Sequence, residues 1–377
     1  MLHIVTRLNV GGPAFELQAM QEFFTPEIHS ELLVGVCESD EVEFLESNEI
    51  RGELSIVDSL HKSIHLPTDF KAFWAIRRAV NLKKPDIVHT HMSKAGLLGR
   101  LASISVRPRP LIVHTYHGHV FDGYFGKAKT KAVITIERLL AHYSARLLAI
   151  GTKTKFDLVD RQIGDANQVV VIPTGMLPLE GKSRKDVRKD LGISQDKFVI
   201  IFAGRLTRIK RIDRLVEVIR LSAHKENLTW IVAGGGDEMR LIEQVIEEDC
   251  ADIRFLGWRS DLDDIFCASD LSILLSDNEG TPLSVIQAGF HGVPTLATLV
   301  GSVGDLITDN LNGFLVERNP YAIATRISWL IDHPEVVEKA GRASRNLFTD
   351  SFSGRTSAEH HAKIYRDIIN ERQADES

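Results

Sequence analysis

Short hydrophobic runs alternate with stretches of helical periodicity along almost the whole chain. In the first half, such runs predict strands at 2–6, 31–36, 87–90, 111–115, 147–150 and 169–172. Between them, amphipathic periodicity predicts helices near 14–24, 70–82, 95–103, 130–142 and 154–161. This alternation is typical of a parallel sheet with helices on both faces.

A second series of the same kind begins at residue 198. Strands are expected at 198–202, 229–233, 253–256, 271–275, 295–297 and 314–316. The intervening residues 176–196 are rich in Gly, Lys, Ser and Asp, and we interpret them as a linker trailing into a short helix. The chain is therefore expected to form two α/β domains, Rossmann-like and facing a cleft, with ligands beyond the carboxyl ends of the strands.

The composition fits this organisation. The 377 residues are 44% hydrophobic and 25% charged, an ordinary globular mix and enough for two domains. Cys37, Cys250 and Cys267 are far apart, which favours a reducing compartment over disulfides or a zinc site. We expect no signal peptide and find no apolar run near the roughly 20 residues of a membrane span. These features predict a cytoplasmic protein, soluble or peripheral on the inner face of a membrane.

The net charge of -6 is unevenly distributed. Residues 1–58 hold 2 Lys+Arg against 12 Asp+Glu, whereas residues 59–172 hold 18 against 7, a balance of +11. The remaining residues hold 25 against 32. The basic middle block is either a solvated face or a surface for an anionic partner such as a phospholipid or a phosphorylated acceptor.

One strand-to-helix turn carries the strongest chemical signal. The strand at 271–275 is followed by Glu279-Gly280-Thr281-Pro282-Leu283-Ser284 and then by a helix that ends before Gly292. The first amide groups of a helix have no partner within it, and its dipole favours an anion there. We place Pro282 in the first helical turn, where its missing N–H is not needed. Glu279 would stand beside the anion, facing hydroxyl groups of whatever the phosphate carries. The alternative is an ordinary loop before a helix.

Three other strand-end loops of the second half predict the rest of a diphosphate site. On the loop that begins at Gly204, Arg205 leaves a strand end and Lys210 opens the next helix, a spacing that suits two phosphates. Gly234, Gly235 and Gly236 allow close approach of the backbone. Trp258 and Arg259 follow Gly257, where an aromatic side chain and exposed backbone could hold a base.

The first half offers a glycine turn and two loops rich in histidine. Gly11 and Gly12 precede a helix, but neither a P-loop nor a dinucleotide fingerprint is present. The loops hold five histidines, at positions 89, 91, 114, 117 and 119. A metal site is disfavoured because only Asp122 offers a carboxylate, so hydrogen bonding to a substrate hydroxyl is the better interpretation.

A basic amphipathic helix follows these loops. Lys127, Lys129 and Lys131 precede a hydrophobic face formed by Ile134, Ile136, Leu139 and Leu140. The segment is either a core-facing helix with solvated lysines or a helix that lies on an anionic membrane. Both interpretations stay open from the sequence.

Taken together, these motifs resemble glycosyltransferase family 4, whose members have the GT-B fold. The resemblance covers nearly the whole chain. It consists of Gly11-Gly12, Thr-x-His-Gly at 115–118, Val-Ile-Pro-Thr-Gly at 171–175, Gly-Arg-Leu-x-x-x-Lys at 204–210, Phe-Leu-Gly at 255–257 and Glu-Gly-x-Pro at 279–282. It implies an acceptor-binding domain at 1–175, a nucleotide-sugar domain at 197–350, and a helix within 351–377 that packs back on the first domain.

The resemblance also implies the reaction and the residues that perform it. A sugar would pass from a nucleotide diphosphate to an acceptor with retention and without a metal or other cofactor. The implied catalytic residues are Arg205 and Lys210 at the leaving diphosphate, Glu279 at the sugar hydroxyls and His117 at the sugar near the acceptor. The implied donor-binding residues are Gly11, Gly12, Gly235, Trp258, Arg259, Gly280, Thr281, Pro282, Leu283, Ser284 and Gln287.

One residue departs from the family pattern. A second glutamate usually comes after the first with seven residues between them, and Gln287 stands there instead. An amide oxygen can still accept a hydrogen bond from a ribose hydroxyl, but without the assistance of charge. The expected cost is about 1 kcal/mol of donor affinity, with no effect on the chemical step.

The identities of donor and acceptor follow only in outline. UDP with a hexose or N-acetylhexosamine is the first choice of donor, and a glycan or lipid-linked acceptor of cell-surface polysaccharide or glycolipid synthesis is expected. A nucleotide-sugar epimerase of the same architecture and a non-catalytic nucleotide-binding relative are the alternatives. No nucleic acid partner is expected, and the sequence gives no indication of oligomeric state.

Overall fold

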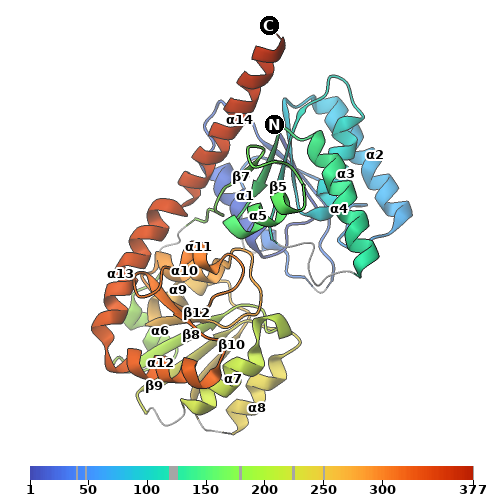
Figure 1. The fold of residues 1–377 in the computed structure, drawn as a ribbon. Coiled ribbons are helices and arrows are strands. Elements are labelled where there is room, and N and C mark those ends of the chain that lie inside the picture. The colour runs from blue at the N-terminus through green and yellow to red at the C-terminus, as the bar shows by residue number, and fades with distance from the viewer. Residues whose placement is uncertain are drawn as a thin grey trace. The chain divides into compact units, whose positions relative to one another are not determined.

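The structure, a computed structural model, describes residues 1–377 except 40, 47–48, 119–125, 178–180, 223–225, 249–250 and 377. The chain forms two compact units, each built on its own parallel sheet (Figure 1). The first unit combines Met1–Leu177 with Ser353–Ser377, and the second comprises Pro178–Phe352.

The first unit contains seven parallel strands in the order β3-β2-β1-β4-β5-β6-β7. Six of them match predicted strands. The pattern missed β3, an edge strand whose residues are mostly exposed, so it lacks the buried apolar run that marks the others. The bounds are β1 Leu2–Val5, β2 Glu31–Val34, β3 Glu53–Ile56, β4 Ile87–His91, β5 Leu111–Tyr116, β6 Arg146–Ala149 and β7 Val169–Val171.

Helices cover both faces of this sheet. Successive strand residues point to opposite faces, so Val88 of β4 joins the core beneath α2 and α3, whereas Ile87 joins the core beneath α14. Tyr365 and Ile368 of α14 complete that second core. The helices are α1 Gly12–Phe23, η1 Phe44–Glu46, α2 Leu66–Lys83, α3 Ser93–Ile104, α4 Lys127–His142, α5 Thr152–Asp160 and α14 Gly354–Glu376.

The second unit contains six parallel strands in the order β10-β9-β8-β11-β12-β13. All six correspond to predicted strands: β8 Phe198–Ala203, β9 Leu228–Ala233, β10 Asp252–Gly257, β11 Leu271–Leu274, β12 Thr295–Thr298 and β13 Gly313–Val316. The helices are α6 Arg184–Asp190, η2 Arg208–Lys210, α7 Ile212–Leu221, α8 Met239–Glu247, α9 Leu262–Ala268, α10 Leu283–Phe290, α11 Val303–Leu306, α12 Pro320–Asp332 and α13 Pro334–Ser351.

The segment 176–196, predicted as a linker, contributes a helix to the second unit. Arg188 of α6 is fully buried and donates to the Ala268 carbonyl at 2.9 Å and to Asp270 at 2.8 Å. Its remaining donors bond carbonyls that follow α6. A buried guanidinium with this many partners anchors α6 to α9, so the polar composition reflects a paired charge rather than a free connection.

Among the helices that the structure describes, none combines the length and apolar character that crossing a lipid bilayer requires.

Candidate functional site

Backbone contacts at glycines hold three strand-end loops of the second unit close to each other. The Gly234 amide donates to the Gly257 carbonyl at 2.7 Å, and the Leu206 amide donates to the Gly235 carbonyl at 2.8 Å. Gly234 has a φ of +143°, and a Cβ built on it would lie 1.9 Å from the Gly204 oxygen. The loops after β8, β9 and β10 therefore approach each other at distances that only glycine permits.

The predicted base-binding residues lie on this glycine platform. A Cβ on Gly235 would lie 2.7 Å from Nε1 of Trp258, so the indole rests directly against the backbone there. Trp258 is 54% exposed and presents aromatic surface to a ligand. The Arg259 guanidinium is instead held along its own loop by Asp261, at 2.7 and 2.6 Å. Trp258 thus has open surface for a base, whereas Arg259 would have to leave its carboxylate partner.

Lys210 and Glu279 meet at the centre of the second unit's loops. Lys210 Nζ lies 2.6 Å from Glu279 Oε1, and the Ser276 hydroxyl donates to the same oxygen. Glu279 is only 8% exposed, and a Cβ on Gly301 would lie 1.8 Å from its carbonyl oxygen. The loops after β11 and β12 therefore fix the carboxylate, which in turn orients the ammonium group.

The lysine occupies a different local position from the one expected. It ends the short helix η2 rather than opening α7, because Arg211 adopts a left-handed conformation with a φ of +58° between the two helices. Arg211 and Arg214 both donate to Asp277, at 2.9 and 3.0 Å. These two cations hold the turn in place, and the turn presents Lys210.

Arg205 differs from these arginines. Its side chain is exposed and makes no hydrogen bond or ion pair with any residue that the structure describes. It leaves β8 two residues after the last strand position, on the loop that Gly204 begins. Arg205 is therefore an exposed cation without a partner among the described residues, whereas Lys210 is paired with Glu279.

Helix α10 begins one residue later than the sequence predicted. Pro282 is its N-cap residue, in an extended conformation, and the helix starts at Leu283. The first-turn placement of Pro282 is therefore corrected, because the first intrahelical amide belongs to Val285, which donates to the Pro282 carbonyl at 3.1 Å. Gly280, Thr281, Leu283, Ser284 and Gln287 are all partly exposed along this segment, which follows Glu279 directly.

The start of α1 is open in the first unit. Gly11 is the N-cap and Gly12 the first helical residue. A Cβ on Gly12 would meet nothing within 4 Å among the described residues, so a ligand can reach this backbone. This accessibility is what the predicted role of the two glycines requires.

The histidines lie mostly in strands and not in loops, contrary to the prediction. His89 and His91 belong to β4 and His114 to β5, where alternation turns the rings into the interior. His117 follows β5, while His119 and Asp122 lie outside the described residues. The predicted strands 87–90 and 111–115 already contained His89 and His114, so the error lay in assigning these histidines to the loops that follow.

The buried rings form two groups of hydrogen bonds within one cluster. His3 Nδ1 lies 2.9 Å from His91 Nε2, and His91 Nδ1 lies 3.1 Å from His117 Nε2. His89 bonds the Tyr365 hydroxyl of α14 and the Thr115 hydroxyl, each at 2.7 Å. Sequence reasoning missed the contributions of α1 and α14 to this network, Glu16 and His361. Its one visible signal was an acid at position 16, among the buried residues of an amphipathic helix.

Burial keeps these groups uncharged. Loss of water lowers the pKa of His3 and His117 to about 3 and that of His361 to about 4, with neighbouring imidazoles adding to the effect. The pKa values of His89 and His91 fall well below their usual range for the same reasons. The same desolvation raises the pKa of Glu16 to about 8.

Three of the histidines could in principle approach a metal ion. Nitrogens of His3, His89 and His91 lie within 4.8 Å of one another. Both ring nitrogens of His89 are already hydrogen-bonded, however, and His3 bonds His91 directly. An ion would have to displace these bonds, so the arrangement fits a hydrogen-bonded network better than a coordination site.

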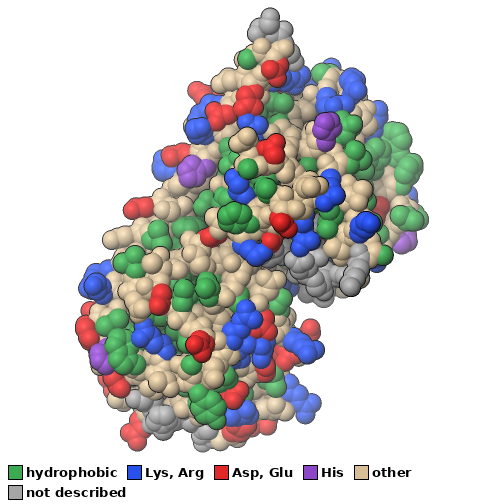
Figure 2. Space-filling view, viewed as in Figure 1, with side chains coloured by type: hydrophobic (Ala, Val, Ile, Leu, Met, Phe, Trp, Pro, Cys, Tyr) green, Lys and Arg blue, Asp and Glu red, His purple; other side chains and the backbone are tan. Residues whose placement is uncertain are grey.

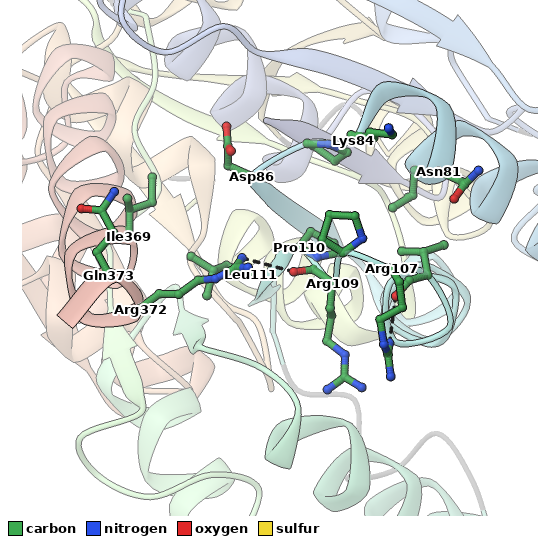
Figure 3. Close-up of a pocket in the computed structure, with 14 residues that line it drawn as sticks. Asn81, Lys84, Asp86, Arg107, Arg109, Pro110, Leu111, Ile369, Arg372 and Gln373 are labelled. Atoms are coloured by element: carbon green, nitrogen blue, oxygen red, sulfur yellow. Dashed lines mark hydrogen bonds between the residues drawn. The ribbon is translucent and has the colours of Figure 1, made fainter. Parts of the chain in front are cut away.

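A basic cavity of about 270 Å³ lies in the first unit, at the end of its sheet where β4 and β5 begin (Figure 3). Lys84, Arg107, Arg109 and Arg372 line it beside the residues that begin β4 and β5. Arg372 donates to the Arg109 carbonyl at 3.2 Å. Because the predicted ligand loops follow the other ends of the strands, this cavity is separate from the candidate site.

The predicted basic helix is α4, and only part of its apolar face is packed. Leu140 is buried and Ile134 half-buried, but Ile136 and Leu139 are 43% and 58% exposed. The core-facing interpretation therefore holds for only part of the stripe, and Glu137 is also buried on this helix. Arg100 donates to both Glu137 oxygens at 2.9 and 2.7 Å, which ties α4 to α3.

The exposed apolar surface continues on α2. Figure 2 shows hydrophobic side chains gathered at the edge of the first unit where Figure 1 places this helix. Leu66 is 80% and Phe70 65% exposed, and Phe70 packs edge-on against Trp74. Lys129 and Lys131 of α4 are exposed as well, and Lys127 belongs to the same helix.

Comparison with known proteins identifies each half of the chain. A family model described as "Glycosyl transferase 4-like domain" matches residues 32–175, and one described as "Glycosyl transferases group 1" matches residues 183–347. A curated relative from Escherichia coli, UDP-Gal:alpha-D-GlcNAc-diphosphoundecaprenol alpha-1,3-galactosyltransferase, is 26% identical over 324 residues. The match covers 83% of this chain and 83% of that enzyme.

Solved structures match both units together. Sucrose-phosphate synthase from Thermosynechococcus elongatus gives a TM-score of 0.81 at 18% identity over 98% of this chain and 99% of that one. HepE from Anabaena, solved in complex with UDP-glucose, gives 0.80 at 17% identity over 97% and 99%. At this level of identity the likeness shows the fold, which is two Rossmann-like parallel-sheet units in one chain.

Proposed function

We propose, on the premise that this chain belongs to glycosyltransferase family 4 with the GT-B fold, that it transfers a hexose or N-acetylhexosamine from a UDP-sugar to a glycan or lipid-linked acceptor with retention. The observation that carries the proposal is the pairing of Lys210 with a buried, oriented Glu279, at 2.6 Å, on the segment that leads into α10. The exposed Arg205 leaves the same end of the second unit's sheet.

This arrangement suits departure of a diphosphate. Cleavage of the anomeric bond leaves positive charge on the sugar and negative charge on the leaving phosphate. Lys210, Arg205 and the amides of Leu283 and Ser284 would stabilise that phosphate. Glu279 would accept hydrogen bonds from sugar hydroxyls through the oxygen that Lys210 does not hold. The departing phosphate oxygen would take the acceptor's proton on the same face, so we assign no protein base and no metal.

The choice of donor and acceptor has support outside the site. The E. coli relative is named for a UDP-galactose donor and a diphosphoundecaprenol-linked acceptor, and HepE was solved with UDP-glucose. A UDP-sugar and a lipid-linked acceptor are therefore the first to test on this chain, in the setting of cell-surface polysaccharide synthesis.

A lipid-linked acceptor calls for contact with a membrane. The exposed Leu66, Phe70 and Trp74 of α2 and the exposed lysines of α4 belong to one unit and join apolar with basic surface. Such a combination suits insertion of side chains into the headgroup region of an anionic membrane. We therefore place this protein peripherally on the cytoplasmic face.

A thermal-shift screen of UDP, GDP and their sugars is the first experiment, because a ligand at 100 times its Kd stabilises by about 2.7 kcal/mol. The stabilising donor is then incubated with and without acceptor, and the product's anomeric configuration is read by NMR, with EDTA as a check on metal. Transfer with retention is expected. Conversion of donor alone would identify an epimerase, and nucleotide binding without either reaction a non-catalytic relative.

Vesicle flotation tests the membrane placement. Full-length protein is expected to float with vesicles that contain phosphatidylglycerol and not with phosphatidylcholine alone. Phe70→Ser and the double variant Lys129→Gln/Lys131→Gln should each reduce the floated fraction several-fold. Equal recovery with and without anionic lipid would remove the proposal.

A further inference from the structure

Glu16 of α1 is a buried acid enclosed by imidazole rings. It is 1% exposed, and neither of its carboxyl oxygens has a hydrogen bond of regular geometry with any described residue. Oε2 lies 3.5 Å from His117 Nδ1, and Oε1 lies 3.5 Å from His361 Nε2. An acid without partners in the interior is costly, so its position between two rings requires an explanation.

The tautomer of His361 fixes the proton on one side. His361 Nδ1 lies 2.8 Å from the carbonyl oxygen of Ser357, which can only accept. Nδ1 must therefore carry a hydrogen. Because the buried ring is neutral, Nε2 then holds a lone pair, and that lone pair faces Glu16 Oε1. The favourable partner for it is a carboxylic O–H.

The same argument carries through to His117. If Oε1 of Glu16 holds the proton, Oε2 is an acceptor and takes a hydrogen from His117 Nδ1. His117 Nε2 then carries a lone pair and accepts a hydrogen bond from His91 Nδ1–H. His91 Nε2 in turn accepts from His3 Nδ1. One protonated acid thus gives every bond of the chain a single donor and a single acceptor.

We propose that Glu16 is a positioning residue that acts as a neutral acid and holds His117 in the tautomer with hydrogen on Nδ1. Under the proposed function, on which this inference rests, the ring then meets the donor sugar only as an acceptor through Nε2. A sugar hydroxyl that binds there donates its hydrogen and shares or replaces the bond from His91. The side chain of His117 is about one-tenth exposed, so the ring is not wholly enclosed.

The titratable groups of the cluster that includes Glu16 come from β1, β4, the segment after β5 and α14. They are His3 of β1, His89 and His91 of β4, His117 after β5, and His361 and Tyr365 of α14. All are uncharged at neutral pH, because burial lowers the pKa of the histidines and raises that of Tyr365. The pKa of Glu16 itself rises to about 8, so the O–H is present through neutral pH and is lost above it.

Substitution by glutamine gives a direct test, because an amide can donate to His361 and accept from His117 in the manner of a neutral acid. Glu16→Gln should keep kcat/KM within about 2-fold of the wild type. Glu16→Leu, which has similar volume but no polar atoms, should raise KM for the donor at least 10-fold. Glu22→Gln, further along the same helix, is the matched control and should change neither.

The opposite result is equally clear. If Glu16 acted as a carboxylate, Glu16→Gln would lose as much as Glu16→Leu.

A spectroscopic readout separates this inference from the transferase assignment. Nitrogen-15 NMR of the histidine rings distinguishes the two tautomers without any substrate, with His117→Gln identifying the signal. The Nδ1–H form of His117 is expected at pH 7 in the wild type and in Glu16→Gln, and not in Glu16→Leu, which lacks the acceptor. The Nε2–H form at pH 7 would refute the role of Glu16, even if transfer is observed. The expected tautomer without transfer would refute only the proposed function.

Discussion

The two units use opposite chemistry to build a polar site. The first unit buries uncharged imidazoles and one neutral acid, joined by hydrogen bonds between rings. The second unit places full charges at strand ends, as in the Lys210–Glu279 pair and the exposed Arg205. Neutral groups can distinguish hydroxyls by direction, whereas charges stabilise a phosphate. Under the proposed function, this difference would assign recognition to the first unit and leaving-group stabilisation to the second.

Acid is expected to unfold the first unit before the second, and this is the largest predicted effect. Where the pKa of a histidine is lower in the folded state than its unfolded value of about 6.5, the folded state loses stability as the pH falls below 6.5. The reason is that the unfolded chain then binds more protons. Each fully buried ring with a folded pKa near 3 costs about 2 kcal/mol at pH 5. Among the described residues of the first unit, burial lowers the pKa of six rings: His3, His89, His91, His114, His117 and His361.

Pepsin cleavage between pH 7 and 4, stopped rapidly and mapped by mass spectrometry, measures this order. Fragments from residues 1–177 should arise first, and His142→Gln on the surface of α4 should not change them. Early cleavage confined to residues 181–352 would contradict the expected order of unfolding.

Removal of the second unit's cations should abolish turnover while the first unit stays intact. Lys210→Ala and Arg205→Ala are each expected to lower kcat at least about 100-fold, as loss of a preorganised stabilising group does. Arg208→Ala, an exposed cation within the same short helix, is the matched control and should retain activity. Near-normal transfer by either of the first two variants would show that the phosphate binds elsewhere.

Replacing Gln287 with the glutamate that is usual in the family should strengthen binding of the donor to the second unit. Gln287→Glu should tighten donor binding about 5-fold, since a charge-assisted hydrogen bond to ribose adds about 1 kcal/mol. Because Gln287 lies beyond the first turn of α10, kcat should stay unchanged. Titration calorimetry with the donor tests this, and weaker binding by the variant would show that Gln287 does not meet the ribose.

The smallest expected effect is an alkaline weakening of the second unit. Desolvation opposes the charge of His291, but Asp263 at 2.7 Å and Cys267 outweigh it and raise the pKa of His291 to about 9. Protonated His291 therefore stabilises the folded unit fully below about pH 6.5, and this stabilisation is lost as the pH rises through 9. The melting temperature should fall by about 2 °C over that window, and not in His291→Asn. An identical fall in His291→Asn would assign the weakening to other groups.

The sequence predicted the fold and the second unit's loops because both are local. Glycine turns, cations and the start of α10 each follow a strand within a few residues, so spacing alone places Arg205, Lys210 and Glu279 at one sheet edge. The first unit's network is not local. His89 bonds Tyr365, which is 276 residues away, and Glu16 meets His361 of α14. Only tertiary packing brings these residues together, so periodicity could not identify them.

Helix α14 determines the order in which the two units can mature on the ribosome. The first unit needs Tyr365 and Ile368 to complete a core that begins at Ile87, and Gly354 packs against Ala19 of α1. Residues 178–352 are synthesised before this helix exists, so the second unit can fold while the first still exposes one face of its sheet. The unit that starts the chain is thus the last to close, and during that interval its uncovered histidine-rich face is where a chaperone would be needed.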